Sequence, residues 1–143
     1  MTIPQISVFL ENRAGQLAEI TKLLADNHID IRAISIAETA DYGVARMIVD
    51  DAQKASAILL QHGVILSMTP VWAVQVSDRP AGLSALLGVL AESHIDVEYM
   101  YSLFTHEKGY AYMVLRISNE DGLVPALESK GIKLVGAAEL GLK

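Results

Sequence analysis

The sequence has 143 residues, of which 52% are hydrophobic and 20% charged, as is typical of a packed soluble protein. Its 11 Lys and Arg residues against 17 Asp and Glu residues give a formal net charge of −6, which argues against binding to nucleic acid or to an anionic membrane, since both need a basic surface. The absence of Cys excludes disulfides, thiol nucleophiles and Cys metal sites.

The first half of the chain predicts the order strand, helix, strand, strand, helix, strand. Leu17, Ile20 and Leu24 have the spacing of an apolar helix stripe, and Asp51 is suited to cap a second helix. Short apolar, partly β-branched runs bounded by turn residues indicate the strands. In chain order we expect a strand at 5–10, a helix at 15–27, strands at 29–38 and 44–49, a helix at 52–61 ended by His62 and Gly63, and a strand at 64–68.

The second half repeats the same order. We expect a strand at 72–76, a helix at 82–93, strands at 95–105 and 110–117, a helix at 123–130 and a strand at 132–138. Pro125 is tolerated only in the first turn of a helix, which places the start of the last helix near Asp121.

An internal duplication explains this repetition. An offset of 66 residues (79 − 13) aligns the halves, and it becomes 68 (131 − 63) near the end, so we expect a short insertion at 119–122. Identities in the first register include Arg13 with Arg79, His28-Ile29-Asp30 with His94-Ile95-Asp96, Gly43 with Gly109 and Met47 with Met113. We therefore expect two domains, 1–70 and 71–143, joined by the short linker 69–71.

The βαββαβ order of each half is that of a ferredoxin-like α+β fold. Each half buries one face of its sheet under two helices, and with about 70 residues it is marginally stable alone. We expect the two units to pack as one pseudo-twofold body with an extended antiparallel sheet and helices on one face, because edge-to-edge pairing covers exposed strand edges.

The loop after the first strand of each half is similar to that of a known family. Residues 11–17, Glu-Asn-Arg-Ala-Gly-Gln-Leu, and 77–83, Ser-Asp-Arg-Pro-Ala-Gly-Leu, resemble the (Asp/Asn)-Arg-Pro-Gly-x-Leu loop of ACT domains. The resemblance covers nearly the whole chain, once in each half. It implies two tandem ACT domains that form a non-catalytic regulatory sensor, which needs no cofactor and binds a free amino acid at the interface of the two domains.

The resemblance also implies which residues bind the ligand. In this family the loop and helix start of one domain face the second strand of its partner. One predicted pocket combines Asn12, Gly15 and Gln16 with Asp96, and the other combines Asp78, Ala81 and Gly82 with Asp30. The full candidate set is Leu10, Glu11, Asn12, Arg13, Ala14, Gly15, Gln16, Leu17 and Asp30 in the first half, and Val76, Asp78, Arg79, Pro80, Ala81, Gly82, Leu83 and Asp96 in the second.

The chemistry of a free amino acid suits such loops. Its carboxylate fits the unpaired N–H groups of a helix N-terminus, and its ammonium fits carbonyl, Asp or Asn oxygens. The first loop has Gly15 at the family's Gly position, whereas Ala81 stands there in the second, so we rank the first pocket above the second. Leu10 and Val76 stand where serine-sensing members have a ligand-contacting His, so a serine-specific pocket is not expected.

Several candidates have a purely structural interpretation as well. Asn12 and Asp78 are suited to cap the helices that follow or to form the turns before them, Asp30 and Asp96 to start strands as turn-forming residues, and Arg13 and Arg79 to lie in solvent. The repeated His-x-Asp pairs would suit a divalent metal, but ending a helix explains the His residues better, and no metal site is predicted. An aromatic cluster on one hairpin of the second half would suit an aromatic pocket or a self-association surface, and ordinary sheet packing is the alternative; its members are Tyr99, Tyr101, Phe104, Tyr110 and Tyr112.

Other functions stay open. A ligand-free assembly module is the main alternative, and a small acylphosphatase-like enzyme shares the βαββαβ order, but no phosphate loop or nucleophile–base pair is recognisable, so no catalytic residue is assigned. RNA binding through the sheet would need basic residues beside the tyrosines, where Arg116 is alone. As partners we expect the amino acid, a regulated enzyme in trans and a second copy in a homodimer. The chain shows no signal peptide and no stretch of roughly 18 apolar residues, so we expect a cytoplasmic protein.

Overall fold

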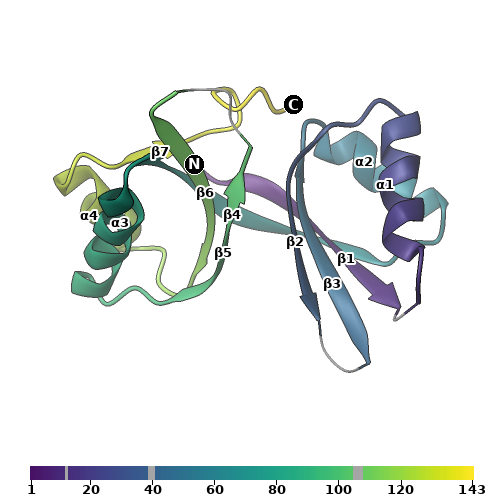
Figure 1. Ribbon diagram of the computed structural model, residues 1–143, viewed down its shortest axis with the longest axis horizontal. Coiled ribbons are helices and arrows are strands. Elements are labelled where there is room, and N and C mark those ends of the chain that lie inside the picture. Colours follow the sequence, from purple (N-terminus) through teal and green to yellow (C-terminus); the bar gives the residue numbers. More distant parts are fainter. Residues whose placement is uncertain (12, 39–40, 105–107) are drawn as a thin grey trace. The chain divides into compact units, whose positions relative to one another are not determined.

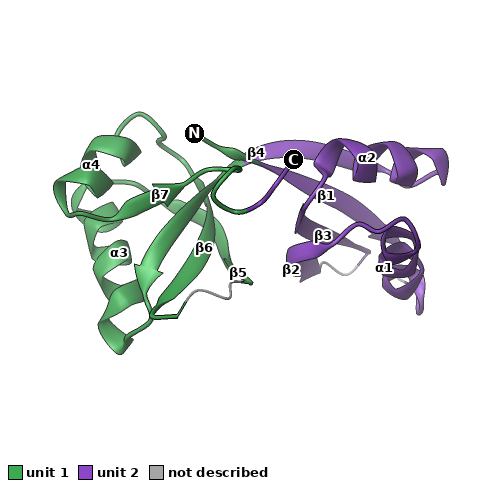
Figure 2. Cartoon of the chain, turned by 90° about the horizontal axis from the view of Figure 1, so that it is seen from above, with its two compact units in different colours: residues 1–3, 71–140 green, residues 4–70, 141–143 purple. Residues whose placement is uncertain are grey.

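A computed structural model describes residues 1–11, 13–38, 41–104 and 108–143 (Figure 1). The chain divides into two compact units (Figure 2). Unit 2 comprises Pro4–Pro70 with Gly141–Lys143, and unit 1 comprises Val71–Leu140 with Met1–Ile3. The elements are β1 (Ile3–Glu11), α1 (Gln16–Asp26), β2 (Ile31–Glu38), β3 (Tyr42–Val49), α2 (Ala52–Gln61), β4 (Leu66–Ser77), α3 (Pro80–Glu92), β5 (Val97–Leu103), β6 (Tyr110–Ile117), α4 (Leu123–Ser129) and β7 (Lys133–Val135).

Both units have the predicted ferredoxin-like α+β fold. The strand order is β2-β3-β1-β4 in unit 2, and in unit 1 β4 pairs with both β6 and β7 while β5 pairs with β6. The apolar sides of the strands pack against two helices in each unit (Figure 1). The core of unit 2 includes Ile6, Val8, Leu24, Met47 and Leu59, and that of unit 1 includes Trp72, Val74, Leu90, Leu115 and Leu127.

All four helices end in the same left-handed turn. The residue after the C-cap has a positive φ at His28 (59°), Gly63 (74°), His94 (56°) and Gly131 (69°). At the end of α1, the N–H of His28 donates to the Ala25 carbonyl and the N–H of Ile29 to the Leu24 carbonyl. This is the Schellman arrangement, which satisfies the last carbonyls of the helix. The prediction that both His residues end their helices is confirmed, and backbone geometry explains their place without a metal.

The predicted linker at 69–71 is wrong. The strands expected at 64–68 and 72–76 form one continuous strand, β4, that passes through Pro70. The fixed φ of proline is compatible with an extended strand, and proline differs from other strand residues in that it lacks a backbone N–H donor. The register of β4 with β6 begins at Trp72 and that with β7 at Ala73, so neither ladder needs a donor at position 70.

The predicted insertion at 119–122 is also misplaced. Leu10 pairs with Gly43 on β3, whereas its repeat counterpart Val76 pairs with Ala111 on β6, so the offset has already reached 68 (111 − 43) in these strands. The two extra residues therefore lie between β5 and β6. A slip of two residues keeps every side chain on the same face of a strand, which is why the alternation in the sequence did not reveal it.

Some element ends differ from the prediction. The helix expected at 82–93 begins at Pro80, where proline suits the first helical position. The strand expected at 132–138 ends at Val135, because the chain turns there and the N–H of Leu140 donates to the Gly136 carbonyl. The second helix matches its prediction at 52–61, and Asp51 caps it by accepting a 3.1 Å hydrogen bond from the Lys54 N–H.

Candidate ligand site

The first loop leaves the N-terminus of α1 open. β1 ends at Glu11 and α1 begins at Gln16, and Asn12 lies outside the described residues. Gly15 occupies the N-cap with φ 86°, and no side chain of the described residues caps this end. A Cβ built on Gly15 would meet no atom within 4 Å. Glycine is therefore favoured at this position by the left-handed backbone conformation and not by a steric clash with a neighbour. Within the described part of the chain, the first N–H groups of α1 therefore receive no side-chain cap, and a ligand carboxylate is a suitable acceptor for them.

Arg13 is held beside this loop by two carboxylates. Its Nη1 and Nη2 donate to the two oxygens of Glu19 at 3.3 and 3.1 Å, and its Nε lies 3.8 Å from Glu11. The hydrogen bonds that Arg13 donates to Glu19 raise the pKa of Arg13 and lower the pKa of Glu19. Both side chains are half exposed or more, so the pair fixes the position of Arg13 but adds little stability.

The second loop is built differently. Only Asp78 and Arg79 separate β4 from α3, and the N-cap is Arg79 without a side-chain cap. The interpretation of Asp78 as a helix cap is therefore wrong; its N–H donates to the Gly109 carbonyl at 2.9 Å. A Cβ on Gly82 would lie 1.9 Å from the Ser77 carbonyl oxygen, so this glycine is needed for packing of α3 against the strand end.

Two hollows flank the first loop of unit 2. The larger hollow has a volume of about 420 Å³, within the range of small-molecule sites, and the smaller hollow about 160 Å³. Both are lined by Leu10, Glu11, Arg13 and Gln16. The larger hollow is also lined by Phe9, Glu19, Ile20, Asp41, Tyr42, His62, Gly63, Val64 and Ile65, and the smaller hollow by Leu17, Ile36, Glu38 and Gly43.

Five of the candidate residues of the first half thus meet around the hollows, namely Leu10, Glu11, Arg13, Gln16 and Leu17. Ala14, Gly15 and Asp30 line neither hollow. Glu19, Asp41, Tyr42 and the segment 62–65 also line the larger hollow and were not predicted from the sequence. The offset of 66 aligns Tyr42 with Lys108, and only the strand pairing identifies its counterpart as Tyr110, since Tyr42 pairs with Glu11 and Tyr110 with Ser77.

Gln16 carries a polar atom that lacks a partner. Its Oε1 is buried, and no described residue donates a hydrogen bond to it. A buried acceptor left unpaired costs about 1–3 kcal/mol, so a ligand that supplies an N–H at this place would recover that free energy. Since Gln16 lines both hollows, its oxygen is the polar feature that most favours a ligand here.

A corresponding hollow of about 440 Å³ lies in unit 1. Its lining includes the counterparts of Leu10, Glu11, Gln16 and Tyr42, which are Val76, Ser77, Gly82 and Tyr110. Of the candidate residues of the second half, Val76 and Gly82 line it, whereas Asp78, Arg79, Pro80, Ala81, Leu83 and Asp96 do not. The repeat has therefore kept the position of the hollow and changed its chemistry.

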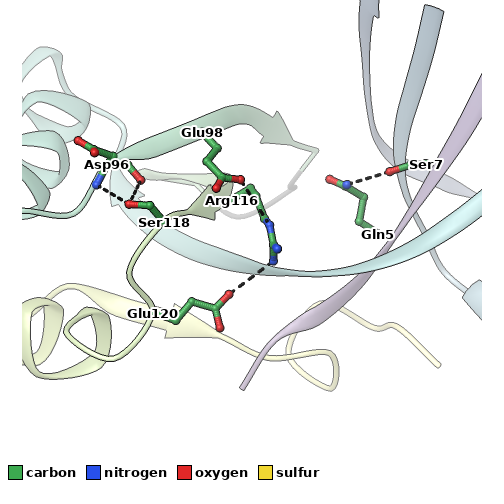
Figure 3. Close-up of polar contacts among 7 residues, drawn as sticks. All are labelled: Gln5, Ser7, Asp96, Glu98, Arg116, Ser118 and Glu120. Atoms are coloured by element: carbon green, nitrogen blue, oxygen red, sulfur yellow. Dashed lines mark hydrogen bonds and ion pairs between the residues drawn. The ribbon is translucent and has the colours of Figure 1, made fainter.

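Asp30 and Asp96 hold the starts of the central hairpins. The N–H of Asp30 donates to Oδ1 of Asp50 at 3.0 Å, and the Asp30 carboxylate accepts from Arg32 Nε at 2.8 Å. In unit 1 the N–H of Asp96 donates to Ser118 Oγ at 3.3 Å (Figure 3). The structural interpretation of both residues is confirmed, and a role of either in a pocket formed with the other half stays a prediction.

The basic residue near the tyrosines of unit 1 is held by acids. Arg116 Nε lies 3.6 Å from Glu98, and Nη1 lies 3.5 Å from Glu120 (Figure 3). The rings of Tyr99 and Tyr101 stack on the same strand with centroids 6.4 Å apart. An arginine paired with two carboxylates is a poor phosphate ligand, which weighs against RNA binding on this surface.

Other classes of site find no support within the described ranges. No group of three or more His, Asp or Glu side chains there is arranged to hold a metal ion. None of the described helices combines the length and apolar character needed to span a bilayer.

One family model matches nearly the whole chain. The family model of the ACT domain pair matches residues 1–140. The crystal structure of protein BT0572 from Bacteroides thetaiotaomicron is similar over 99% of this chain and 96% of that chain, with 37% identity and a TM-score of 0.90. The regulatory subunits of aspartate kinase from Thermus thermophilus (ligand-free form) and Thermus flavus cover 88% of this chain and 90% of theirs, with 15% and 17% identity and TM-scores of 0.64 and 0.60, and show the fold alone. None of the curated proteins compared with the sequence matches it.

Proposed function

This chain belongs to the family of ACT domain pairs, and we propose that it is a non-catalytic regulatory protein that binds a free amino acid. The observation that carries the proposal is a hollow lined by Gln16, whose buried Oε1 has no donor among the described residues, at the start of α1, which no described side chain caps. The N–H groups of α1 suit the ligand carboxylate, and the Gln16 oxygen suits its ammonium or another N–H donor.

We place the preferred site at the first loop. The first four N–H groups of an α-helix have no partner within the helix, but α3 begins with Pro80, which removes one of these donors. In addition, Gly82 packs directly against the backbone of Ser77. These two features support the predicted ranking of the first pocket above the second.

The finer parts of the proposal rest on the sequence. The ACT resemblance assigns the ligand to the interface of domains 1–70 and 71–143, where Asp96 would face the first loop and Asp30 the second. We further propose that the protein forms a homodimer in the cytoplasm and that ligand binding alters its association with a separate enzyme. A ligand-free assembly module is the competing function.

A thermal-shift screen against the twenty amino acids, followed by calorimetric titration of each hit, tests the binding. One or a few amino acids should raise the melting temperature, since ligand at about a hundredfold above its Kd adds about 2.7 kcal/mol. If none of the twenty stabilises the protein and none binds in the calorimeter, the sensor proposal is wrong and the assembly module takes its place.

A pair of glycine substitutions then locates the site. Asn tolerates a positive φ, so Gly15→Asn should fold normally while its side chain occupies the space in front of α1. Gly109→Asn is the matched control, because Gly109 has nearly the same φ (85°) and equally open surroundings in unit 1. Loss of binding in Gly15→Asn alone supports the first loop, whereas equal binding in both variants contradicts this placement.

A further inference from the structure

The larger hollow of unit 2 is lined by more acidic than basic groups. Glu11, Glu19 and Asp41 line it together with one cation, Arg13. Glu19 and Glu11 already pair with that arginine, so its charge is compensated within the hollow. The Arg, Asp and Glu residues of the lining therefore sum to a charge of 1 − 3 = −2, and a cationic ligand is favoured over a neutral or anionic one.

The hydrogen-bonding groups of the hollow point to the same ligand chemistry. The buried Oε1 of Gln16 is an acceptor without a donor among the described residues. The Nδ1 of His62 donates to the Ile58 carbonyl at 2.9 Å, so this nitrogen is not available to a ligand. A hollow that offers the Gln16 oxygen together with carboxylate oxygens suits a ligand group with several N–H donors, such as an ammonium or a guanidinium.

The rest of the lining is apolar. Leu10, Ile20 and Val64 contribute aliphatic surface, and the rings of Phe9 and Tyr42 lie 6.3 Å apart at 48°. Methylene groups are stabilised on such surfaces, and aromatic faces attract cations. A ligand with an aliphatic chain that ends in a positive charge combines both requirements.

The repeat provides an internal comparison. The hollow of unit 1 has Gln75, Ser77, Ala85 and Lys133 where the larger hollow of unit 2 has Phe9, Glu11, Glu19 and Ile65, and no carboxylate of the described residues lines it. At these four positions the acidic and aromatic lining is therefore a property of unit 2 and does not follow from the fold.

We infer that the amino acid bound at the first loop has a basic side chain, and that its ammonium or guanidinium group enters the larger hollow of unit 2. This inference rests on the proposed function and names the ligand class of the same site. The carboxylate of the ligand meets the N-terminus of α1, and the side-chain cation meets Gln16 Oε1 with the carboxylates of Glu19 and Asp41 nearby.

The contributions differ in size. Exposed carboxylates at the rim act through a field that salt screens over about 8–10 Å, so each changes affinity only a few-fold. The buried Gln16 oxygen gives a hydrogen bond to a charged group in a partly desolvated place, where loss of the acceptor lowers affinity by about tenfold or more.

Calorimetric titration with matched amino acids tests the ligand class. L-lysine is compared with L-norleucine, and L-arginine with L-citrulline, because each pair has similar shape and differs in charge. We expect the charged member of at least one pair to bind about tenfold or more tightly, with an affinity that falls as salt is raised. If another amino acid binds while the charged and neutral members are equal, the proposed function stands and this inference is overturned; if no amino acid binds, both are.

Variants at Gln16 assign the cation to the larger hollow. Gln16→Met keeps the shape but removes the acceptor, so it should weaken binding of the basic amino acid about tenfold, whereas Gln16→Glu should strengthen it. Asp41→Asn should weaken it only a few-fold and reduce its salt dependence. Glu92→Gln removes one exposed charge from α3 and serves as the control. Unchanged affinity in both Gln16 variants, with native melting curves, overturns the inference.

Discussion

Gly82 lies so close to the carbonyl oxygen of Ser77 that a Cβ at this position would be 1.9 Å from it. No flexible side chain is involved, because the contact is with the backbone at the end of β4. The helix α3 can therefore start directly after a two-residue loop only because glycine stands at position 82. In unit 2 the corresponding loop is longer, and its glycine, Gly15, serves a left-handed backbone.

We expect Gly82→Ala to destabilise unit 1 by about 2 kcal/mol or more, because the backbone must shift to remove the overlap. Gly88 lies on the exposed side of the same helix, and a Cβ there meets no atom within 4 Å. Gly88→Ala should therefore raise stability by about 0.5–1 kcal/mol through helix propensity. Urea denaturation of the two variants measures the contrast, and equal effects at both positions would contradict it.

The two His residues in left-handed turns offer a second prediction. His28 and His94 have φ values of 59° and 56°, a conformation that glycine adopts at the equivalent ends of α2 and α4. We expect His94→Gly to stabilise the protein by a few tenths to about 1 kcal/mol, because glycine has no Cβ penalty there.

Gly131→Ala tests the same turn in the opposite direction, since alanine at a φ of 69° should cost about 1 kcal/mol. Thermal and urea denaturation compare both variants with the parent protein. A loss of stability in His94→Gly would show that the imidazole makes a favourable interaction that outweighs its backbone strain.

The order of the elements was predictable because each depends on local pattern. Asp51 followed by an apolar stripe defines α2, and turn residues separate β5 from β6. The duplication added strength, since each half predicts the same order. What the sequence hid was the position of the two extra residues, because the pairing of Leu10 with Gly43 and of Val76 with Ala111 depends on contacts between strands and not on alternation.

The candidate site was predictable only where it is contiguous. Glu11, Arg13 and Gln16 belong to the loop that resembles the ACT motif, and they line the hollows. Asp41 and His62 come from a hairpin and a helix end, which only the folded unit brings beside that loop. The ion pair of Arg13 with Glu19 forms because the first turn of α1 brings the two side chains together, and a separation of six residues in the sequence does not predict it.

The cap of α2 gives a third prediction. Asp51 accepts a hydrogen bond from the Lys54 N–H, and removal of such a cap costs about 0.5–2 kcal/mol. Asp51→Ala should therefore lower the free energy of unfolding by about 1 kcal/mol, whereas Asp51→Asn should nearly preserve it, because Asn caps equally well. Urea denaturation distinguishes the two, and an equal loss in both variants would mean that the charge and not the cap matters.

The pair of Arg13 and Glu19 makes stability depend on pH. The hydrogen bond from Arg13 lowers the pKa of Glu19 in the folded protein below its usual value of 4.5. A carboxyl group whose folded pKa is depressed contributes stability above its unfolded pKa and loses it as the pH falls through the folded pKa. The contribution is therefore present at neutral pH and disappears in acid.

Glu19→Gln removes this titration while it keeps the side-chain size. At pH 7 we expect the melting temperature of the parent protein to be slightly higher than that of the variant. This difference should vanish as the pH falls below about 4. Because both side chains are half exposed or more, 0.5 M salt should reduce the difference at pH 7. Lys22→Gln breaks another exposed ion pair of α1, with Asp26, and is the control for a general loss of surface charge. A difference between Glu19→Gln and the parent that is constant from pH 7 to pH 3 would show that the Glu19 carboxylate contributes nothing through Arg13.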